Sequence, residues 1–438
     1  MSDLEKNHFS HASTHSTDSI SSDDNRIWRD DSPPNFFPFK ATEKPPAFEF
    51  SVQDLFKEIK DNLGADVFDI PFVGNGANHF GLHGRLVDGR DVMIRISRYD
   101  LNWTKLYKPT CKDAATRVEK ILTRVAFEAN VYALLGSQRD IKASHLLYHR
   151  LPVWQISANT TETPDHLIGR DIFVFEKAAG SNDFWPLDEL KNREILAQCA
   201  RMRAALFSFA VPIDFAKSWL HNSPPGPEVM PSIIAPTRDF AISFISAKVE
   251  EMIKNEGDMT GWESDHNVVG PIAFKAKHSL LRLIPFILPL DDPHGALYRL
   301  VLEHGDFGIH NMTITDAPTV TSVFDWETGH IVPAILSDPR LMVCCDLEVD
   351  EHGTPIISRL WDEMEVEDIL LYQEFANHYY QILAQHAPDY LETIKMGKDA
   401  RHIWFALTAW RGADPEDYFG ALGLWADQRY REHTGQAL

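Results

Sequence analysis

Apolar and polar residues alternate along the first part of the chain in patterns that change from helical to extended and back. Residues 51–63 have helical spacing, and a β-rich stretch from Phe72 to Ser97 follows them. Within that stretch Asp88-Gly89 separates two apolar runs, which is a strong hairpin signal. Residues 113–135 carry apolar side chains at intervals of three and four, and this spacing predicts a long amphipathic helix.

The later part of the chain has a mostly helical pattern. A strand is predicted at residues 171–175, and the breaker cluster Ser223–Pro227 separates two helices after it. Residues 257–270 are rich in polar residues and glycine, so we expect them to end the second of these helices. The predicted helical segments are 187–209, 238–253, 362–385 and 400–434.

Composition separates a polar tail from a globular body. Residues 1–45 are rich in Ser, His, Asp and Pro, so we expect a disordered tail. The net charge of −22 argues against a nucleic-acid partner, because phosphate backbones select basic surfaces. The four cysteines show no metal-ligand spacing, and the chain has neither a membrane-length apolar run nor a signal or transit segment. We therefore expect a cytoplasmic protein without a membrane partner.

The most informative polar residues lie around a predicted hairpin. Met312–Thr315 and Val320–Phe324 are β-rich runs joined by a turn, so Asn311 is expected opposite Phe324, with Asp325 at the same end of the ladder. Asp306 lies on the loop that leads into this end. Two oxygen ligands and a free carboxylate suit a magnesium ion and a general base, which indicates phosphoryl transfer.

This pattern resembles the aminoglycoside phosphotransferase/choline kinase-like family, whose signature is H-G-D-x-x-x-x-N followed by D-W-E. Here the signature reads from His304 to Asn311 and then Asp325-Trp326-Glu327. The resemblance implies an enzyme that uses ATP or GTP, with Asp306 as catalytic base and Asn311 and Asp325 as magnesium ligands. It also implies a small-molecule hydroxyl as acceptor, and His304 as a brace of the catalytic loop.

The same resemblance implies an α+β, bilobal protein kinase-like fold. Residues 46–175 would form a small β-rich N-lobe with one main helix, and residues 176–438 a larger, mostly helical C-lobe. Asp306-Phe307-Gly308 also spells the D-F-G triplet of protein kinases, but the H-R-D-type loop that should precede it is missing between Leu281 and Arg299. We interpret that spelling as accidental.

The nucleotide site implied by the resemblance lies in the N-lobe and in the segment after it. Gly74, Asn75 and Gly76 would line the phosphates, although two glycines near a turn need only a positive φ to be explained. Arg95 stands where such enzymes have a lysine, and an exposed strand arginine is the simpler reading. Glu128 lies on the apolar face of residues 113–135 and is the expected partner of Arg95, with Glu119 as the alternative.

The hinge and the acceptor site have weaker sequence signals. Backbone groups between Glu176 and Ala178 would bind the adenine ring, with Gly180 providing a turn. Acidic residues predominate between Asp338 and Glu374, so this run is either an acceptor surface for a cationic substrate or a solvated face. Asp338 itself is expected to support the catalytic loop. An aromatic stripe is interpreted as core, with acceptor binding as the alternative: Trp404, Trp410, Tyr418, Phe419 and Trp425.

Three other functions compete with the phosphotransferase. A nucleotide-binding pseudokinase or scaffold is favoured slightly by Arg95 and the irregular glycine loop, and opposed by the intact acidic and amide residues. A metallohydrolase would use His304, Asp306, His310 and Asp325 around a tightly bound metal. A protein kinase is disfavoured because no A-P-E sequence follows Asp325.

Overall fold

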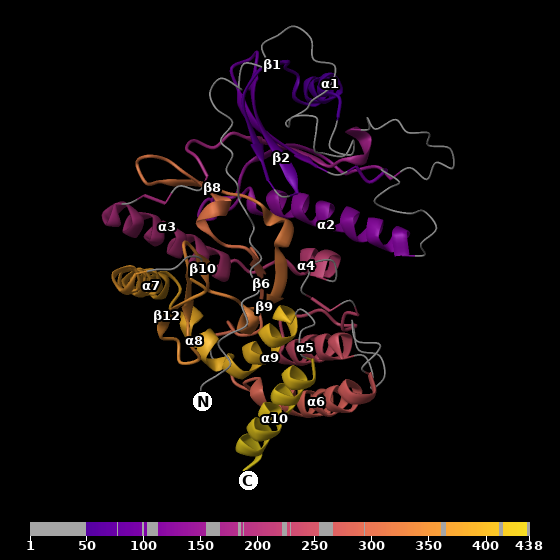
Figure 1. Cartoon of the computed structure of the whole chain (residues 1–438), viewed down its shortest axis with the longest axis vertical. Coiled ribbons are helices and arrows are strands. Elements are labelled where there is room, and N and C mark those ends of the chain that lie inside the picture. The colour runs from indigo at the N-terminus through magenta and orange to yellow at the C-terminus, as the bar shows by residue number, and fades with distance from the viewer. Residues whose placement is uncertain are drawn as a thin grey trace. The chain divides into compact units, whose positions relative to one another are not determined.

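The computed structural model describes residues 50–435 except 77, 99, 103–112, 155–166, 183–184, 187, 221–225, 228, 254–265, 293, 361–364 and 411–414. The predicted tail, residues 1–45, therefore lies outside the described residues. The chain divides into two compact units, which are drawn in Figure 1. Unit 1 comprises residues 1–107 and 152–177, and unit 2 comprises residues 108–151 and 178–438.

Unit 1 contains an antiparallel sheet and one helix among its described residues. Its strands are hydrogen-bonded in the order β1-β2-β3-β5, and the predicted Asp88-Gly89 turn joins β2 to β3, with Gly89 at a φ of 90°. The predicted first helix is confirmed, because the Ser51 side chain caps its start and Gly64 ends it. The elements are α1 (Val52–Leu63), β1 (Val67–Asn75), β2 (His79–Leu86), β3 (Asp91–Ser97), the short 3₁₀ helix η3 (Leu167–Gly169) and β5 (Ile172–Glu176).

Unit 2 is mainly helical, as the pattern predicts. The long helix over residues 113–135 is confirmed, and those predicted at 187–209 and 238–253 appear within two residues of their predicted ends. The helices are α2 (Asp113–Leu135), α3 (Glu189–Ser208), α4 (Ile213–Trp219), α5 (Arg238–Met252), α6 (His266–Ile287), α7 (Val366–His386), α8 (Pro388–Met396), α9 (Lys398–Ala409) and α10 (Pro415–Thr434).

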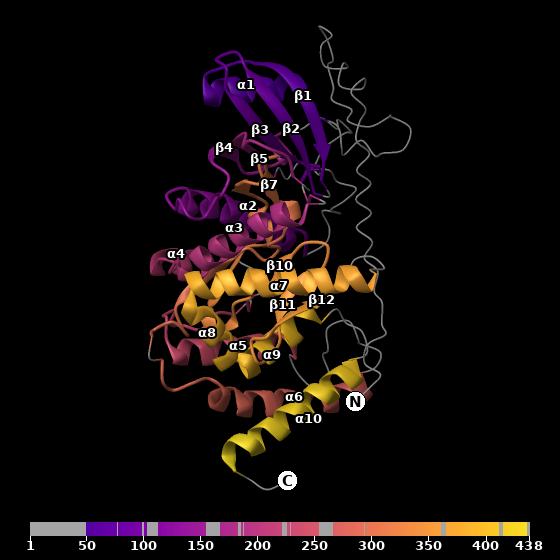
Figure 2. The ribbon, with the colours of Figure 1, turned by 90° about the vertical axis from the view of Figure 1, so that its left-hand side faces the viewer.

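Short strands of unit 2 form small antiparallel sheets between the helices. β6 (Leu300–Glu303) pairs with β9 (His330–Pro333), and β7 (Met312–Ile314) pairs with β8 (Val320–Val323). A three-stranded sheet of β10 (Leu341–Met342), β11 (Asp346–Val349) and β12 (Pro355–Ser358) lies beside α7, as Figure 2 shows. The remaining short elements are β4 (Leu146–Arg150) and the 3₁₀ helices η5 (Ile309–Asn311), η6 (Trp326–Thr328) and η7 (Ala334–Leu336).

One sequence expectation is wrong in unit 2. Residues 266–270 do not end a helix but belong to α6, which continues through Pro271 and packs against α10. The acidic run after Asp338 contains the β10–β12 sheet, which the sequence pattern does not predict. The chain thus mixes helix and sheet and confirms the α+β class; the kinase-like arrangement of two lobes stays a prediction. Among the described residues, no helix is long and apolar enough to cross a bilayer.

Candidate functional site

The β7–β8 hairpin has the predicted register. Met312 pairs with Val323, and the N–H of Phe324 donates to the carbonyl of Asn311 over 3.0 Å. Asn311, the last residue of η5, and Asp325, just beyond β8, therefore flank the same end of this ladder. Backbone pairing alone thus brings together two residues that are fourteen positions apart in the sequence.

Two glycines give the loop before η5 its shape. Gly305 has a φ of 79°, and a Cβ there would lie 2.2 Å from the carbonyl oxygen of Thr328. Any side chain would therefore be strained in φ and would collide with η6. Gly308 has an ordinary extended backbone, but a Cβ would lie 2.4 Å from Cε1 of His310. The missing side chain at position 308 thus makes room for the imidazole ring of His310.

The Asp306 carboxylate is held by two neighbours on this loop. His310 Nε2 lies 3.0 Å from Oδ2, and Asn311 Nδ2 donates to the same oxygen over 2.9 Å. Burial alone would raise the pKa of Asp306, but the hydrogen bonds from His310 and Asn311 outweigh it and hold the pKa below its usual value. Asp306 is therefore ionised at neutral pH and remains 41% exposed. In the described part of the chain, its Oδ1 has no hydrogen-bond partner.

His304 connects the start of the loop to the end of β8. Its side chain is buried, Nε2 lies 2.8 Å from the carbonyl oxygen of Phe324, and the ring contacts Trp326 at 4.5 Å. Burial lowers the pKa of His304 to about 4, so the ring is neutral and Nε2–H donates to that carbonyl. These contacts support the predicted role of His304 as a brace rather than a reacting group.

Asp325 adopts an unusual backbone conformation. Its φ of 65° and ψ of 56° lie in the left-handed region, which costs a non-glycine residue about 1 kcal/mol. Its N–H donates to the hydroxyl of Tyr132, a buried residue of α2, over 3.0 Å. Strained residues of this kind concentrate at functional sites. The sequence pattern identifies Tyr132 only as one residue of an apolar stripe, although its buried hydroxyl needs a partner.

Behind the loop lies a buried ion pair. Arg203 of α3 and Glu303, the residue before His304, are both almost fully buried and approach to 2.6 Å. Arg203 also stacks over Phe307 at 4.3 Å and donates to the carbonyl of Arg340 over 3.0 Å. Because Phe307 follows Asp306 directly, this pair fixes the loop from the inside.

The oxygen donors of the hairpin suit magnesium. Both amide hydrogen bonds of Asn311 use Nδ2, to the carboxylate and to the carbonyl of Asp306, so Oδ1 is left to accept a cation. With Asp325 it makes two hard oxygen donors, which fits an ion that takes most of its ligands from water and phosphate. Within the described ranges, no three His, Cys, Asp or Glu residues gather as metal ligands.

In unit 1 the candidate phosphate loop joins β1 to β2. Neither Gly74 nor Gly76 has a positive φ, so the explanation by turn geometry is wrong. Gly76 is instead crowded, because a Cβ there would lie 3.0 Å from the carbonyl oxygen of His79. The Gly76 N–H donates to that oxygen, and the Gly76 carbonyl accepts from Arg98. Asn75 is the last residue of β1, and phosphate binding by this loop stays a prediction.

Arg95 lies in the middle of β3, where it pairs with Phe173 of β5. Its guanidinium stacks over the Phe173 ring at 4.7 Å, so it is not a freely solvated strand arginine. Burial would raise the pKa of Asp171, but a hydrogen bond from His79 and the charges of His79 and Arg95 lower it. Glu128 is 2% exposed on α2 and belongs to unit 2, so its pairing with Arg95 stays a prediction.

The segment after β5 is attached to the hairpin of unit 2. The chain leaves unit 1 after Lys177, beyond the predicted hinge residue Glu176, and enters unit 2 at Ala178. Ser181 and Ile314 exchange backbone hydrogen bonds of 3.0 and 2.8 Å. Gly180 has a φ of 108°, and a Cβ there would lie 2.3 Å from the carbonyl oxygen of Ile314. Gly180 therefore provides the predicted turn and allows this close approach.

The acidic segment is only partly exposed. Asp346 of β11 is 1% exposed and lies 3.2 Å from Arg340, which also approaches Asp338 and Glu348. Burial raises the pKa values of Asp346 and Glu348, whereas nearby arginines outweigh burial and lower the pKa of Asp338. Met342, beyond Asp338, donates its N–H to the carbonyl of Phe307 over 3.0 Å, so this segment contacts the loop that carries Asp306.

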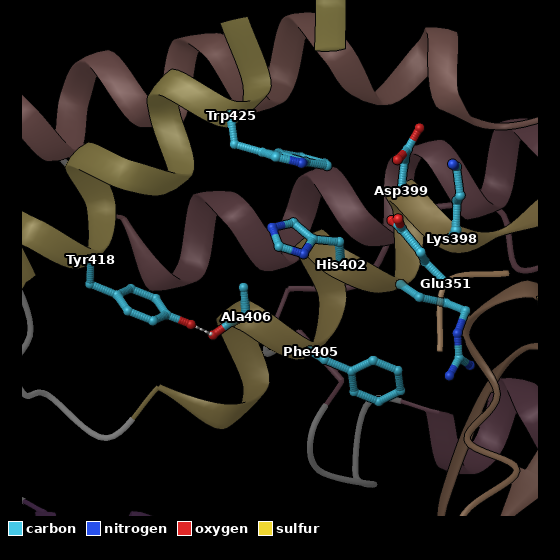
Figure 3. Close-up of a pocket in the computed structure, with 9 residues that line it drawn as sticks. Glu351, Lys398, Asp399, His402, Phe405, Ala406, Tyr418 and Trp425 are labelled. Carbon is cyan, nitrogen blue, oxygen red and sulfur yellow. Dashed lines mark hydrogen bonds between the residues drawn. The ribbon is translucent and has the colours of Figure 1, made fainter. Parts of the chain in front are cut away.

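The aromatic stripe of the last two helices is divided between core and surface. Trp404 and Phe419 are buried, as predicted. Tyr418 and Trp425 instead line an open pocket of about 450 Å³ between α9 and α10, where Trp425 faces His402 at 4.2 Å (Figure 3). Its charged lining residues carry both signs, so the pocket has no evident preference for a charged ligand: Glu351, Lys398, Asp399 and Arg401.

Comparison with solved structures finds small-molecule phosphotransferases and kinases. A Plasmodium vivax ethanolamine kinase is similar, with 12% identity, 92% of this chain and 94% of that chain covered, and a TM-score of 0.41. An aminoglycoside-3′-phosphotransferase of type VIII has 11% identity, 78% and 98% coverage, and a TM-score of 0.34. A macrolide 2′-phosphotransferase from Brachybacterium faecium has 14% identity, 85% and 98% coverage, and a TM-score of 0.32.

These structures are of the class that the His304–Asn311 pattern predicts. No family model matches the chain. No curated protein matches it either. With identities this low, the roles of single residues rest on the chain's own geometry.

Proposed function

We propose that the protein is a magnesium-dependent phosphotransferase of the aminoglycoside phosphotransferase/choline kinase-like family, which transfers the γ-phosphoryl group of ATP or GTP to a hydroxyl of a small molecule. The observation that carries the proposal is the state of Asp306. Its carboxylate is ionised, partly exposed and fixed through one oxygen, while the other oxygen accepts no hydrogen bond within the described chain. A carboxylate held in this way is suited to accept a proton from an acceptor hydroxyl.

In the proposed reaction the acceptor oxygen attacks the γ-phosphorus, and the bond from that phosphorus to the β–γ bridging oxygen breaks. The hydroxyl proton passes to Asp306, and the nucleoside diphosphate leaves with the bridging electron pair. Magnesium, when bound to Asn311 and Asp325, neutralises the charge of the nucleotide phosphates. Asp306 has a lowered pKa and is therefore a weak base, so most of the rate enhancement would come from orienting the hydroxyl.

Nucleotide binding in this proposal is assigned to the predicted N-lobe, residues 46–175, and to the segment after it. Gly74, Asn75 and Gly76 would lie along the phosphates, and Arg95 would pair with them and with Glu128. The backbone of Glu176 and Ala178 would hydrogen-bond the base. The proposed N-lobe, residues 46–175, therefore differs from unit 1, because residues 108–151 belong to unit 2. Support comes from the buried carboxylate of Glu128, because a buried carboxylate needs a partner such as a guanidinium.

The acceptor class is proposed from the motif alone. A hydroxyl-bearing small molecule fits a loop that carries one carboxylate base, and a cationic acceptor would suit the net charge of −22. A screen with radiolabelled ATP and GTP against a library of hydroxyl- and amine-bearing metabolites tests this. Phosphate incorporation that requires Mg²⁺ and is lost in Asp306→Asn is expected. If incorporation persists fully in Asp306→Asn, the role assigned to Asp306 is wrong.

A nucleotide-binding pseudokinase is the second candidate, because Arg95 replaces the lysine of active enzymes and is stacked on Phe173. A pseudokinase is distinguished from an active phosphotransferase by Mg²⁺-dependent nucleotide binding without phosphate transfer to any acceptor in the same screen. Arg95→Lys provides a sharper test, since a pseudokinase that lacks only the lysine should gain transfer activity in this variant.

A further inference from the structure

The imidazole of His310 lies at a position that the phosphotransferase signature leaves unspecified. Its Nε2 is 3.0 Å from Oδ2 of Asp306. An ionised carboxylate can only accept hydrogen bonds, so Nε2 must carry the proton in this contact. His310 therefore donates this hydrogen bond from Nε2–H because Asp306 is charged. The same holds whether the imidazole ring is neutral or protonated.

Both donors of the loop meet on one oxygen of Asp306. His310 and Asn311 donate to Oδ2, and in the described chain nothing donates to Oδ1. A single donor would leave the carboxylate free to rotate about its Cβ–Cγ bond, whereas two donors from different directions oppose that rotation. The carboxylate is thus oriented so that Oδ1 is the oxygen open to an incoming hydroxyl.

The ring of His310 is itself positioned by the absence of a side chain at Gly308, where a Cβ would lie 2.4 Å from Cε1. The φ of Gly308 is −146°, which any residue adopts, so backbone freedom does not explain a glycine here. The glycine is explained by the space that the His310 ring occupies. Met342 also limits this space, because its Cβ would lie 3.0 Å from a Cβ at position 308.

We propose that His310 is a positioning residue, which holds Oδ2 of Asp306 so that Oδ1 takes the proton of the acceptor hydroxyl. This inference rests on the proposed phosphotransfer. It assigns His310 no contact with substrate and no proton transfer of its own. In this proposal His310 and the Asn311 Nδ2 together orient the Asp306 carboxylate. The Oδ1 atom of Asn311 remains available to bind the metal.

The kinetic test compares His310→Ala with His310→Gln, whose side-chain N–H can reach the place of Nε2. Loss of a hydrogen bond to a charged group should lower kcat about 10- to 100-fold in His310→Ala, with the KM for Mg-nucleotide unchanged. His310→Gln should recover most of kcat. Gly308→Ala should resemble His310→Ala, because it displaces the ring. His352→Ala, at an exposed turn, is the matched control and should keep full activity.

Equal kcat loss in the Gln and Ala variants would contradict the proposal, because only the donor distinguishes them. An increase in the KM for Mg-nucleotide without loss of kcat would also contradict it. Thermal denaturation of both variants shows whether a loss of activity is a loss of folded protein.

A second measurement does not depend on activity. Long-range ¹⁵N NMR correlations of the imidazole groups, assigned with His310→Gln, should show His310 with a proton on Nε2 in the wild-type protein. Replacing Asp306 by Ala should change that signal. If His310 carries its proton on Nδ1 alone, the proposal is wrong even where transfer is observed. If no acceptor is phosphorylated but Nε2 is protonated, the proposed function fails and the positioning of Asp306 by His310 stands.

Discussion

The loop around Asp306 and the acidic segment after Asp338 are joined by a backbone hydrogen bond in unit 2, yet they differ in how well their sequence predicts them. In the loop, residues of different chemistry stand at fixed spacing, and the structure brings them together. The acidic segment is defined only by residues of one charge, and the structure separates them. Asp346 is buried against Arg340, while Glu367 is exposed at the start of α7. Spacing between unlike groups carries more structural information than the total charge of a segment.

The largest effect is expected at the base itself. Asp306→Asn should lower kcat by about 10²- to 10⁴-fold, the usual contribution of a positioned base, and leave Mg-nucleotide affinity largely unchanged. Single-turnover phosphate transfer and nucleotide titration measure the two quantities. Asp346→Asn is the counterpart from the acidic segment and should affect transfer much less. Comparable losses in both variants would mean that the two regions do not differ in function.

The next effect concerns the buried ion pair behind the loop. Glu303→Gln leaves Arg203 with a buried, uncompensated charge and should lower the free energy of unfolding by about 3–5 kcal/mol. The control is Glu374→Gln, which removes the exposed partner of Arg193 and should cost no more than about 1 kcal/mol. Urea denaturation measures both. Similar costs at the two positions would show that burial does not distinguish them.

A smaller effect is expected at Tyr132. Tyr132→Phe removes the acceptor of the Asp325 N–H and should cost about 1 kcal/mol in stability. It should also raise the Mg²⁺ concentration needed for half-maximal transfer, because Asp325 loses a contact that maintains its left-handed conformation. Tyr430→Phe, on α10, is the matched control. An unchanged Mg²⁺ requirement in Tyr132→Phe would show that Tyr132 does not contribute to metal binding.

The smallest effect is a difference in pH dependence. Burial raises the pKa of Asp346 above its usual 3.8, so its contribution to stability is present below pH 3.8 and is lost as pH rises through the folded value. The pKa of Asp306 is lowered, so its contribution is present above pH 3.8 and is lost as pH falls through the folded value. We compare the free energy of unfolding of the wild type with that of Asp306→Asn and of Asp346→Asn as a function of pH. The two differences should change with pH in opposite directions. Parallel slopes would contradict these assignments.

The sequence predicts well those elements whose ends are marked by capping or turn residues. The first helix is bounded by a capping serine and a left-handed glycine, and the hairpin at Asn311 by a turn and two β-rich runs. The sequence pattern does not predict the start of α6, because Gly270-Pro271 is a helix-ending signal. Packing overrides it: α10 approaches so closely that a Cβ at Gly423 would lie 2.9 Å from Ala276 Cα. No local pattern reports such a contact.

The site shows the same division. Asp306, Asn311 and Asp325 are recognisable from spacing alone, because a short hairpin converts that spacing into proximity. Tyr132 and Arg203 contact the site from helices that are distant from it in sequence. The local sequence around these two residues does not predict their contacts with Asp325 and Glu303. The β10–β12 sheet has a local signal in the turn at Gly353, whose φ is 77°.

The backbone pairing of Ser181 with Ile314 has a consequence for local opening. The first residues of unit 2 after Lys177 pair with the ladder that continues to Asn311 and Phe324, next to Asp325. Amides on both sides of this ladder should therefore exchange with deuterium as one cooperative group, with a shared opening free energy. A proteolytic cut or an insertion at Gly180 should increase exchange at Thr313 as well. The link between the units and the candidate metal hairpin would then unfold as a single piece.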